Sequence, residues 1–187
     1  MDAYLEIRLL PDPEFPVSFL MGVLYGKLHR ALVTIESSKI GVSFPGYSQS
    51  PRGMGDRLRL HGDQPALSQL MTQNWLKGMR DHIQCSDILP VPESVQYRTV
   101  SRRQFKTSSE RLRRRRMKRK GETWAQAAAA IPDSIERRPD LPYVHLRSQS
   151  TEQSFTLFIE QGELREQPTS AEFNTYGLSR QATIPWF

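Results

Sequence analysis

Several features that mark common protein classes are scarce or absent in this sequence of 187 residues. Cys85 is the single cysteine, which excludes an internal disulfide and is typical of a protein from a reducing compartment. No apolar run approaches the roughly 20 residues that a membrane-spanning helix needs. The N-terminus carries Asp2 and Glu6 and lacks the layout of a signal peptide. The sequence therefore predicts a cytoplasmic protein with no membrane partner.

Familiar catalytic motifs are missing as well. The sequence has no Walker loop, no GxGxxG pattern, no histidine–cysteine set with metal-ligand spacing and no evident pair of catalytic carboxylates. We therefore expect neither a metal site nor a cofactor, and any catalysis must use histidines and hydroxyl groups. RNA suits such groups as a substrate, because its own 2′-hydroxyl can serve as the nucleophile and no metal-bound water is needed.

Positive charge, in contrast, is concentrated in one segment. The formal net charge is +6, and residues 111–120 hold eight basic residues and no acid, so the rest of the chain is slightly acidic at −2. This arginine strip favours a dedicated contact with a polyanion. A helix over the strip has little to bury and spans roughly 15 Å, about the length that lies in a nucleic-acid groove. The alternative is a solvated or disordered basic run.

Hydrophobic periodicity predicts a strand–helix–strand–strand–helix–strand order in the first half of the chain. Strands are expected at 4–9, 39–44, 57–61 and within 80–89, with a mobile loop at 46–56. Ser18 and Asp63 are the expected caps of the two helices. The apolar stripe of the first helix is formed by Leu20, Leu24, Leu28, Ala31 and Leu32. This order is that of a ferredoxin-like domain.

A linker at 90–93 is expected to divide the chain into a ferredoxin-like domain, residues 1–94, and a smaller α+β domain, residues 95–187. The second domain begins with a basic strand at 95–105. Capping-box spacings at Thr107/Glu110 and Thr123/Gln126 predict helix starts before the arginine strip and before an alanine-rich segment. Short strands are expected at 143–146, 155–159 and 173–176. The predicted fold class is α+β with an arginine-rich helix.

His29 is the histidine with the strongest case for a function. It shares one flank of the first helix with Gly22 and Gly26, and a glycine inside a helix costs roughly 1 kcal/mol relative to alanine. Close packing against the sheet and a backbone surface left bare for a ligand are the two explanations. His61 and His82 are expected to be structural or surface residues, and His145 to be structural or a neighbour of an active site.

Hydroxyl groups gather in two places. Ser148, Ser150 and Thr151 follow Arg147, and Tyr176 offers another hydroxyl near the C-terminus. Polarity at a strand end is the ordinary explanation for the first group. Together with a histidine, the same groups would suit cleavage of RNA by its 2′-hydroxyl.

These residues, taken together, resemble the CRISPR-associated repeat-processing endoribonuclease of type I-F systems over essentially the whole chain. The resemblance is carried by the order and spacing of short stretches, each weak alone: RLLPDPEFP (8–16), GKLH (26–29), IGVSFP (40–45), RLRLH (57–61), LRSQST (146–151), FTLFI (155–159), YGLS (176–179) and PWF (185–187).

The resemblance implies a metal-independent endoribonuclease that binds the stem-loop of CRISPR repeat RNA and cuts at its 3′ base. His29 would transfer the proton of the 2′-hydroxyl beside the scissile phosphate, Ser148 would position that ribose, and Ser150 and Tyr176 would support the site. The product would end in a 2′,3′-cyclic phosphate. The enzyme would keep this crRNA and join the other subunits of the type I-F surveillance complex.

The resemblance also assigns the RNA contacts. Arg102 and Gln104 would read base edges near the foot of the stem, and Phe155 would stack on the terminal base pair. Arg115 and Arg119 would contact the groove. The RNA backbone would be bound by Arg111, Arg114 and Lys118. A second hypothesis is a non-catalytic RNA-binding subunit that keeps this fold but does not cut.

Overall fold

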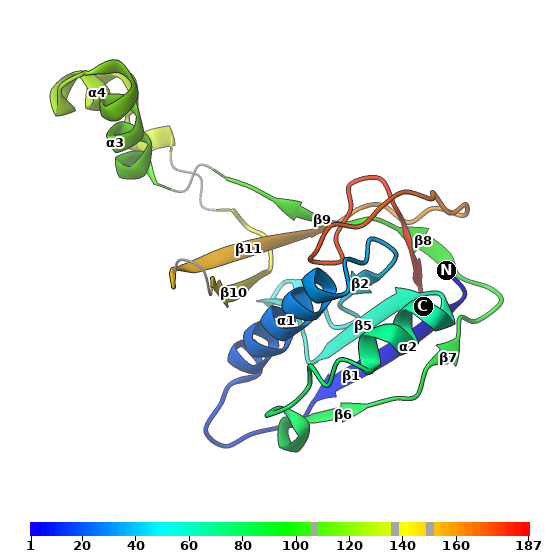
Figure 1. Ribbon diagram of the computed structural model, residues 1–187. Helices are drawn as coiled ribbons and strands as arrows, with labels where there is room; N and C mark the ends of the chain where they lie inside the picture. Colours follow the sequence, from blue (N-terminus) through cyan, green and yellow to red (C-terminus); the bar gives the residue numbers. More distant parts are fainter. Residues whose placement is uncertain (106–107, 136–138, 149–151) are drawn as a thin grey trace. The chain divides into compact units, whose positions relative to one another are not determined.

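The computed structural model describes residues 1–105, 108–135, 139–148 and 152–187. It has the mixed α+β composition that the sequence predicted (Figure 1). The helices are α1 (Val17–Thr34), α2 (Gln64–Met71), α3 (Ser109–Lys120) and α4 (Trp124–Ala130), with short 3-10 turns η1 (Arg80–His82) and η2 (Asp133–Ile135). The strands are β1 (Ala3–Leu9), β2 (Gly41–Ser43), β3 (Ser48–Gln49), β4 (Arg52–Gly53), β5 (Arg57–Gly62), β6 (Ile83–Cys85), β7 (Leu89–Pro90), β8 (Gln96–Arg98), β9 (Val100–Arg103), β10 (Tyr143–Arg147), β11 (Ser154–Gln161) and β12 (Ile184–Trp186).

The chain forms two compact units. The main unit contains Met1–Arg103 and Leu141–Phe187, and the helical unit contains Gln104–Asp140. Among the described residues, no helix is both long and apolar enough to cross a membrane.

An antiparallel sheet organises the main unit. Its strands lie in the order β2-β5-β1-β6, and β7 also pairs with β1. Leu5, Ile7 and Leu9 of β1 are buried and alternate with more exposed residues, as the sequence predicted. Figure 1 shows α1 and α2 on the same side of this sheet.

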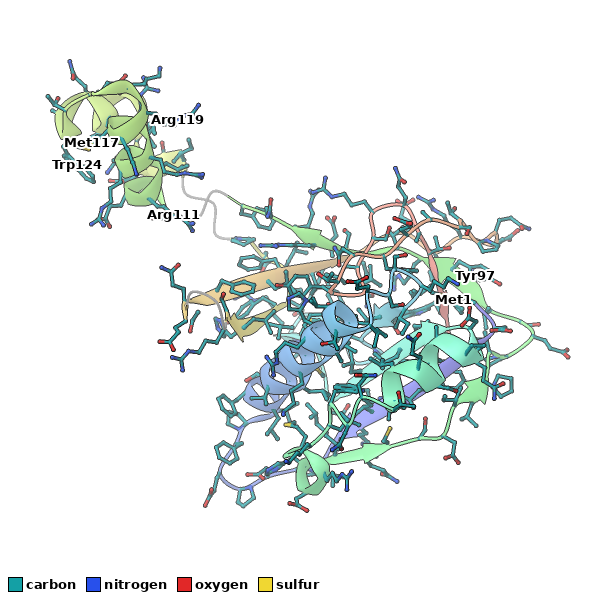
Figure 2. All side chains as sticks on the ribbon, in the orientation of Figure 1. Met1, Tyr97, Arg111, Met117, Arg119 and Trp124 are labelled. Atoms are coloured by element: carbon teal, nitrogen blue, oxygen red, sulfur yellow. The ribbon has the colours of Figure 1, made fainter. Side chains whose placement is uncertain are left out.

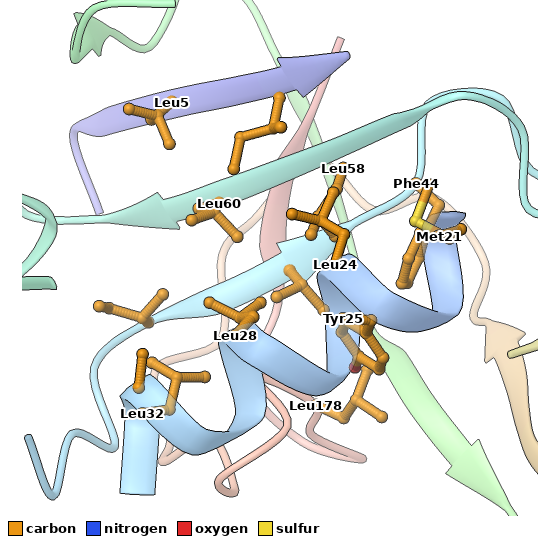
Figure 3. Close-up of a cluster of buried hydrophobic side chains, with 14 of the residues drawn as sticks. Leu5, Met21, Leu24, Tyr25, Leu28, Leu32, Phe44, Leu58, Leu60 and Leu178 are labelled. Carbon is orange, nitrogen blue, oxygen red and sulfur yellow. The ribbon is translucent and has the colours of Figure 1, made fainter. Parts of the chain in front are cut away.

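The core lies between α1 and the sheet (Figure 3). The whole predicted stripe of α1 is buried, and Leu24 and Leu28 face Leu58 and Leu60 of β5 in this view. Each fully buried leucine stabilises the fold by roughly 1.5–3 kcal/mol relative to an exposed one. The register of α1 on the sheet is therefore fixed by its apolar stripe, and with it the position of every polar residue on the flanks of α1.

The other face of the sheet is covered as well. Arg59 pairs with Glu6 at 2.8 Å, and it donates a hydrogen bond of 2.7 Å to the backbone oxygen of Phe187. The Phe187 ring lies 4.1 Å below the guanidinium carbon. This cover explains why β5 is buried along both faces over most of its length.

A second sheet, in the order β10-β11-β9, belongs to the same unit, and α1 packs against its strand β10. A Cβ atom on Gly22 would lie only 2.5 Å from the carbonyl oxygen of His145 in β10. Close packing is therefore the reason for Gly22. Strand β12, which pairs with β8, was not predicted from the sequence.

The helical unit is a pair of short helices. Helix α4 begins with the predicted capping box of Thr123 and Gln126. Helix α3 covers the arginine strip, so the segment is helical, but its N-cap is Ser108, whose hydroxyl accepts a hydrogen bond from the Arg111 amide. The cap expected at Thr107 is therefore wrong, and Thr107 itself lies outside the described residues.

Three other local predictions are wrong. Helix α1 starts at Val17 with Pro16 as its N-cap and no side-chain cap, so Ser18 lies inside the helix. The expected loop at 46–56 contains the β3-β4 hairpin, where the backbones of Gly46 and Gly55 approach too closely for any side chain. Residues 173–176 form a turn and not a strand.

Candidate active site and RNA-binding face

The turn at 174–178 is the first component of the candidate active site. The Asn174 side chain accepts hydrogen bonds from the amides of Tyr176 and Leu178. Gly177 adopts φ +68°, and a Cβ there would lie 2.6 Å from a methyl group of Val42. The turn therefore needs glycine at this position. It holds Tyr176 against α1.

His29 meets this turn from α1. Its Nδ1 lies 2.8 Å from the carbonyl oxygen of Thr175, and its ring stacks on Tyr176 with centroids 3.8 Å apart and planes 3° apart. A carbonyl oxygen can only accept, so Nδ1 carries the hydrogen and neutral His29 has its lone pair on Nε2. Within the described part of the chain, Nε2 has no hydrogen-bond partner. His29 is therefore oriented as a proton acceptor.

Tyr25 supports the same arrangement from inside the core. It is fully buried one turn before His29, and its hydroxyl donates a hydrogen bond of 2.7 Å to the backbone oxygen of Tyr176. Partial burial raises the pKa of the Tyr176 hydroxyl, while the positive charge of Arg102 acts in the opposite sense. The Tyr176 hydroxyl is therefore protonated at neutral pH and can donate but not act as a base.

A groove beside α1 brings Ser148 to the same flank of the helix. It has a volume of about 670 Å³ and is lined by Gly22, Gly26 and Arg30 of α1 and by His145 to Ser148 from β10 and its end. The Ser148 amide donates a hydrogen bond of 2.9 Å to the Gln153 carbonyl, which closes the end of the β10-β11 hairpin. Ser150 lies outside the described residues.

The structure thus brings His29 and Tyr176 into direct contact. Ser148 lines a groove along the same flank of α1, but His29 is not among the residues that line this groove. Gly26 has room, because a Cβ there would meet only Arg30 at 3.6 Å and Leu146 at 3.7 Å. Gly26 is therefore not explained by packing and leaves backbone open to the groove.

The three remaining histidines have local partners. His61 is buried, its Nε2 lies 2.8 Å from the Ser43 hydroxyl, and desolvation lowers its pKa to about 3. His82 pairs with Asp12 at 2.8 Å. The structural roles predicted for His61 and His82 are confirmed. His145 lines the groove and contacts the Thr156 hydroxyl at 3.3 Å.

The residues expected to read base edges, Arg102 and Gln104, and the residue expected to stack on the terminal base pair, Phe155, are divided between the two units. Arg102 lies on β9, opposite Ile159 of β11. Phe155 lies on β11, partly buried and packed against the core. Gln104 is exposed at the start of the helical unit.

The arginine strip has two faces, which the sequence did not reveal. Arg111, Arg114, Arg115, Lys118 and Arg119 are exposed, and positions with this spacing fall on one side of a helix. We call this set the arginine face; Figure 2 shows Arg111 and Arg119 at its two ends. Arg113 and Arg116, on the opposite side, have partners inside the helical unit.

Sequence reasoning missed several supporting residues: Tyr25, Thr175, Asn174, Arg30 and Arg113. Thr175 acts through its backbone carbonyl and Asn174 through side-chain hydrogen bonds that form the turn, and no sequence motif indicates either role. The hydroxyl of Tyr25 is an unusual polar group in an apolar stripe. That polarity was the one available signal. The described residues contain no cluster of three or more histidine, cysteine, aspartate or glutamate side chains placed to share a metal ion.

Comparison with known proteins finds similarity along essentially the whole chain. A family model described as CRISPR-associated protein (Cas_Csy4) matches residues 4–187. The CRISPR-associated endonuclease Cas6/Csy4 of Pseudomonas aeruginosa (strain UCBPP-PA14) is 49% identical over 187 residues, which is 100% of both chains. A protein of the same name from Escherichia coli (strain UTI89 / UPEC) is 48% identical over 187 residues, again 100% of both chains.

Proposed function

The chain belongs to the Cas_Csy4 family of CRISPR-associated proteins, and from this premise we propose that it is a CRISPR RNA-processing endoribonuclease. It binds the stem-loop of CRISPR repeat RNA and cuts at the 3′ base of the stem. The cut is made by the 2′-hydroxyl of the RNA, without a metal ion, and leaves a 2′,3′-cyclic phosphate. The enzyme keeps its crRNA product and joins the other subunits of the type I-F surveillance complex.

The orientation of His29 is the observation that carries this proposal. Because Nδ1 is engaged by the Thr175 carbonyl, Nε2 is the atom that accepts the proton of the 2′-hydroxyl. The alkoxide formed attacks the adjacent phosphorus, the bond from phosphorus to the 5′-oxygen breaks, and that oxygen takes up a proton. Stacking on Tyr176 fixes the plane of the imidazole ring, so the His29 side chain loses little conformational freedom when the substrate binds.

The other site residues act on the substrate's geometry. Ser148 holds the ribose that supplies the nucleophile, and Ser150 and Tyr176 support the site. The Tyr176 hydroxyl is protonated at neutral pH, and partial burial raises its pKa further, so it is a hydrogen-bond donor for phosphate oxygens. Ser148 fits its role because it lines the groove on the same flank of α1 that carries His29.

RNA is held by the arginine face, together with Arg102, Gln104 and Phe155. Arg115 and Arg119 contact bases in the groove, while Arg111, Arg114 and Lys118 bind phosphates. Exposure of all five residues on one side of α3 supports an RNA contact by this face. Arg102 and Gln104 read base edges, and Phe155 stacks on the terminal base pair.

We also propose the domain assignment in functional terms. Residues 1–94 form a ferredoxin-like domain with the catalytic histidine, supported by the antiparallel order β2-β5-β1-β6 with α1 and α2 on one side. Residues 95–187 contribute the RNA contacts and the serines. This functional division differs from the division into compact units, because residues 95–103 and 141–187 pack in the same unit as the N-terminal part.

Replacement of His29 by alanine tests the function directly. We expect cleavage of a labelled repeat stem-loop to fall by at least 100-fold, the usual contribution of general acid–base catalysis, while affinity for the uncut RNA stays within about two-fold. An equal loss of binding and cleavage would show that His29 is not the proton-transfer residue. A wild-type protein that binds the stem-loop but never cuts it would support a non-catalytic subunit instead.

Two further reactions separate the chemical steps. A 2′-deoxy substitution at the nucleotide before the cut removes the nucleophile and should block cleavage without loss of binding. The reaction should proceed unchanged in EDTA, and end-group analysis should find the cyclic phosphate. If EDTA stops the reaction, the metal-independent mechanism is wrong.

A further inference from the structure

The sequence of helix α3 by itself gives the helix only marginal stability. It has 12 residues, and isolated helices shorter than about 12–15 residues are marginal in water. Like charges four residues apart destabilise a helix further, as at Arg111/Arg115 and Arg115/Arg119. We therefore expect contacts outside the arginine face to add to the stability of α3.

Arg113 supplies the largest set of such contacts. Its Nε donates a hydrogen bond of 2.8 Å to the Ile131 carbonyl, just beyond α4, and its Nη2 lies 2.8 Å from Asp133. The guanidinium carbon lies 5.7 Å from the centre of the Trp124 ring. With only 12% of its side chain exposed, Arg113 is turned away from solvent, unlike the arginine face.

Two more pairs reinforce the same junction. The buried Ser109 hydroxyl donates a hydrogen bond of 2.8 Å to the same Asp133 carboxylate. Arg116 forms two hydrogen bonds with Glu122, one of them 3.1 Å long. We call Arg113, Arg116, Ser109, Glu122 and Asp133 the α3–α4 latch. Two of the eight basic residues of the strip are thus committed to holding the helix.

We propose that Arg113 is a positioning residue for RNA binding, which holds α3 folded against α4 so that the arginine face is formed before RNA arrives. This inference rests on the proposed function of the arginine face. When only a fraction of the protein is competent to bind, its apparent dissociation constant rises by the inverse of that fraction. Arg113 therefore raises affinity without contacting RNA.

Salt dependence of binding distinguishes this role from a phosphate contact. We expect Arg113→Gln to weaken stem-loop binding three- to ten-fold with an unchanged slope of log affinity against log salt. The matched control is Arg111→Gln, the same substitution on the arginine face, which should weaken binding and reduce the slope by about 1. Wild-type affinity for Arg113→Gln, or a reduced slope, would overturn the proposal.

Removal of Asp133, one of the two acids in the latch, gives a second test, in which the two explanations predict changes in RNA affinity of opposite sign. Asp133→Ala deletes a negative charge, so electrostatics alone predicts tighter RNA binding, whereas loss of the latch predicts binding weakened at least two-fold. Glu110→Ala is the matched control, because Glu110 pairs with Arg114 on the arginine face. Its removal should leave binding unchanged or tighter. Tighter binding for both variants would contradict a positioning role.

Hydrogen exchange of the RNA-free full-length protein reads the order of α3 itself. Amides of residues 112–120 should be protected in the wild type, and at least ten-fold less protected in Arg113→Gln. Equal protection in both proteins would refute the proposal. Absence of stem-loop binding by the wild type would instead refute the proposed function, and the exchange experiment would still report on the latch.

Discussion

Two glycines of α1, Gly22 and Gly26, lie one turn apart and should differ in how replacement by alanine changes the stability of the protein. At Gly22 the new Cβ would lie 2.5 Å from the His145 carbonyl oxygen, which belongs to backbone and cannot rotate away. Helix α1 and strand β10 must separate, and such overpacking typically costs about 1–3 kcal/mol. At Gly26 the new Cβ would make ordinary contacts at 3.6 and 3.7 Å, so no separation is needed.

The expected effect is the difference in free energy of unfolding between the two alanine variants. Alanine's better helix propensity returns roughly 1 kcal/mol at both positions and therefore cancels in the comparison. We expect Gly26→Ala to be as stable as the wild type or up to about 1 kcal/mol more stable. Gly22→Ala should be about 1–3 kcal/mol less stable than Gly26→Ala, and its Tm should lie several degrees lower.

Unfolding of the full chain in urea, monitored by tryptophan fluorescence, measures the difference in free energy of unfolding between the two variants. Because α1 carries His29 and β10 leads into Ser148, Gly22→Ala should also cut the repeat stem-loop more slowly than the wild type. Equal free energies of unfolding for the two variants would refute the packing argument. Gly22 would then have to be explained by the groove, as Gly26 is.

Three other predictions concern single contacts. Tyr25→Phe removes the buried donor to the Tyr176 carbonyl and should reduce the free energy of unfolding by about 1–2 kcal/mol, with slower cleavage; unchanged stability in urea would argue against this bond. His61 is protonated below about pH 6.5 in the unfolded state, whereas burial lowers its pKa in the folded state to about 3. The free energy of unfolding should therefore decrease as the pH is lowered from 6.5 to 3, by up to about 1.4 kcal/mol per pH unit. His61→Gln keeps a partner for Ser43 and should lose this slope in urea titrations; parallel profiles would contradict the assignment. Arg119→Ala should weaken stem-loop binding by roughly 1–3 kcal/mol, and an unchanged dissociation constant would count against groove contact.

Elements that depend on local pattern were predictable from the sequence. Alternation identifies β1, the apolar stripe identifies α1, and Asp63 caps α2 through the Ala66 amide as expected. A wrong prediction arose where two neighbouring residues could both serve as the N-cap of the same helix. Ser18 has the chemistry of a cap, but Pro16 already has the extended backbone of an N-cap and its carbonyl accepts from Phe19 and Leu20.

The geometry of the candidate site depends on contacts between residues far apart in the sequence, which local patterns do not reveal. His29 was identified on its helix flank, but its tautomer depends on the Thr175 carbonyl, 146 residues away in the chain. Residues 173–176 contain an aromatic and β-branched pattern that suits a strand. The Asn174 side chain and the left-handed Gly177 turn them back instead, and this turn is what brings Tyr176 onto His29.

The arginine strip shows why counting charges overstates what a surface can offer to RNA. The segment 111–120 has no acid of its own, yet Glu122 and Asp133 follow closely and pair with Arg116 and Arg113. A helix that presented all of its cations outward would have little to pack against the rest of the unit. Two arginines are directed inward and pair with the rest of the helical unit, and five of the six remaining cations of the strip lie along one side of the helix. Under the proposed function, the residues that hold α3 in place therefore differ from the residues that contact RNA.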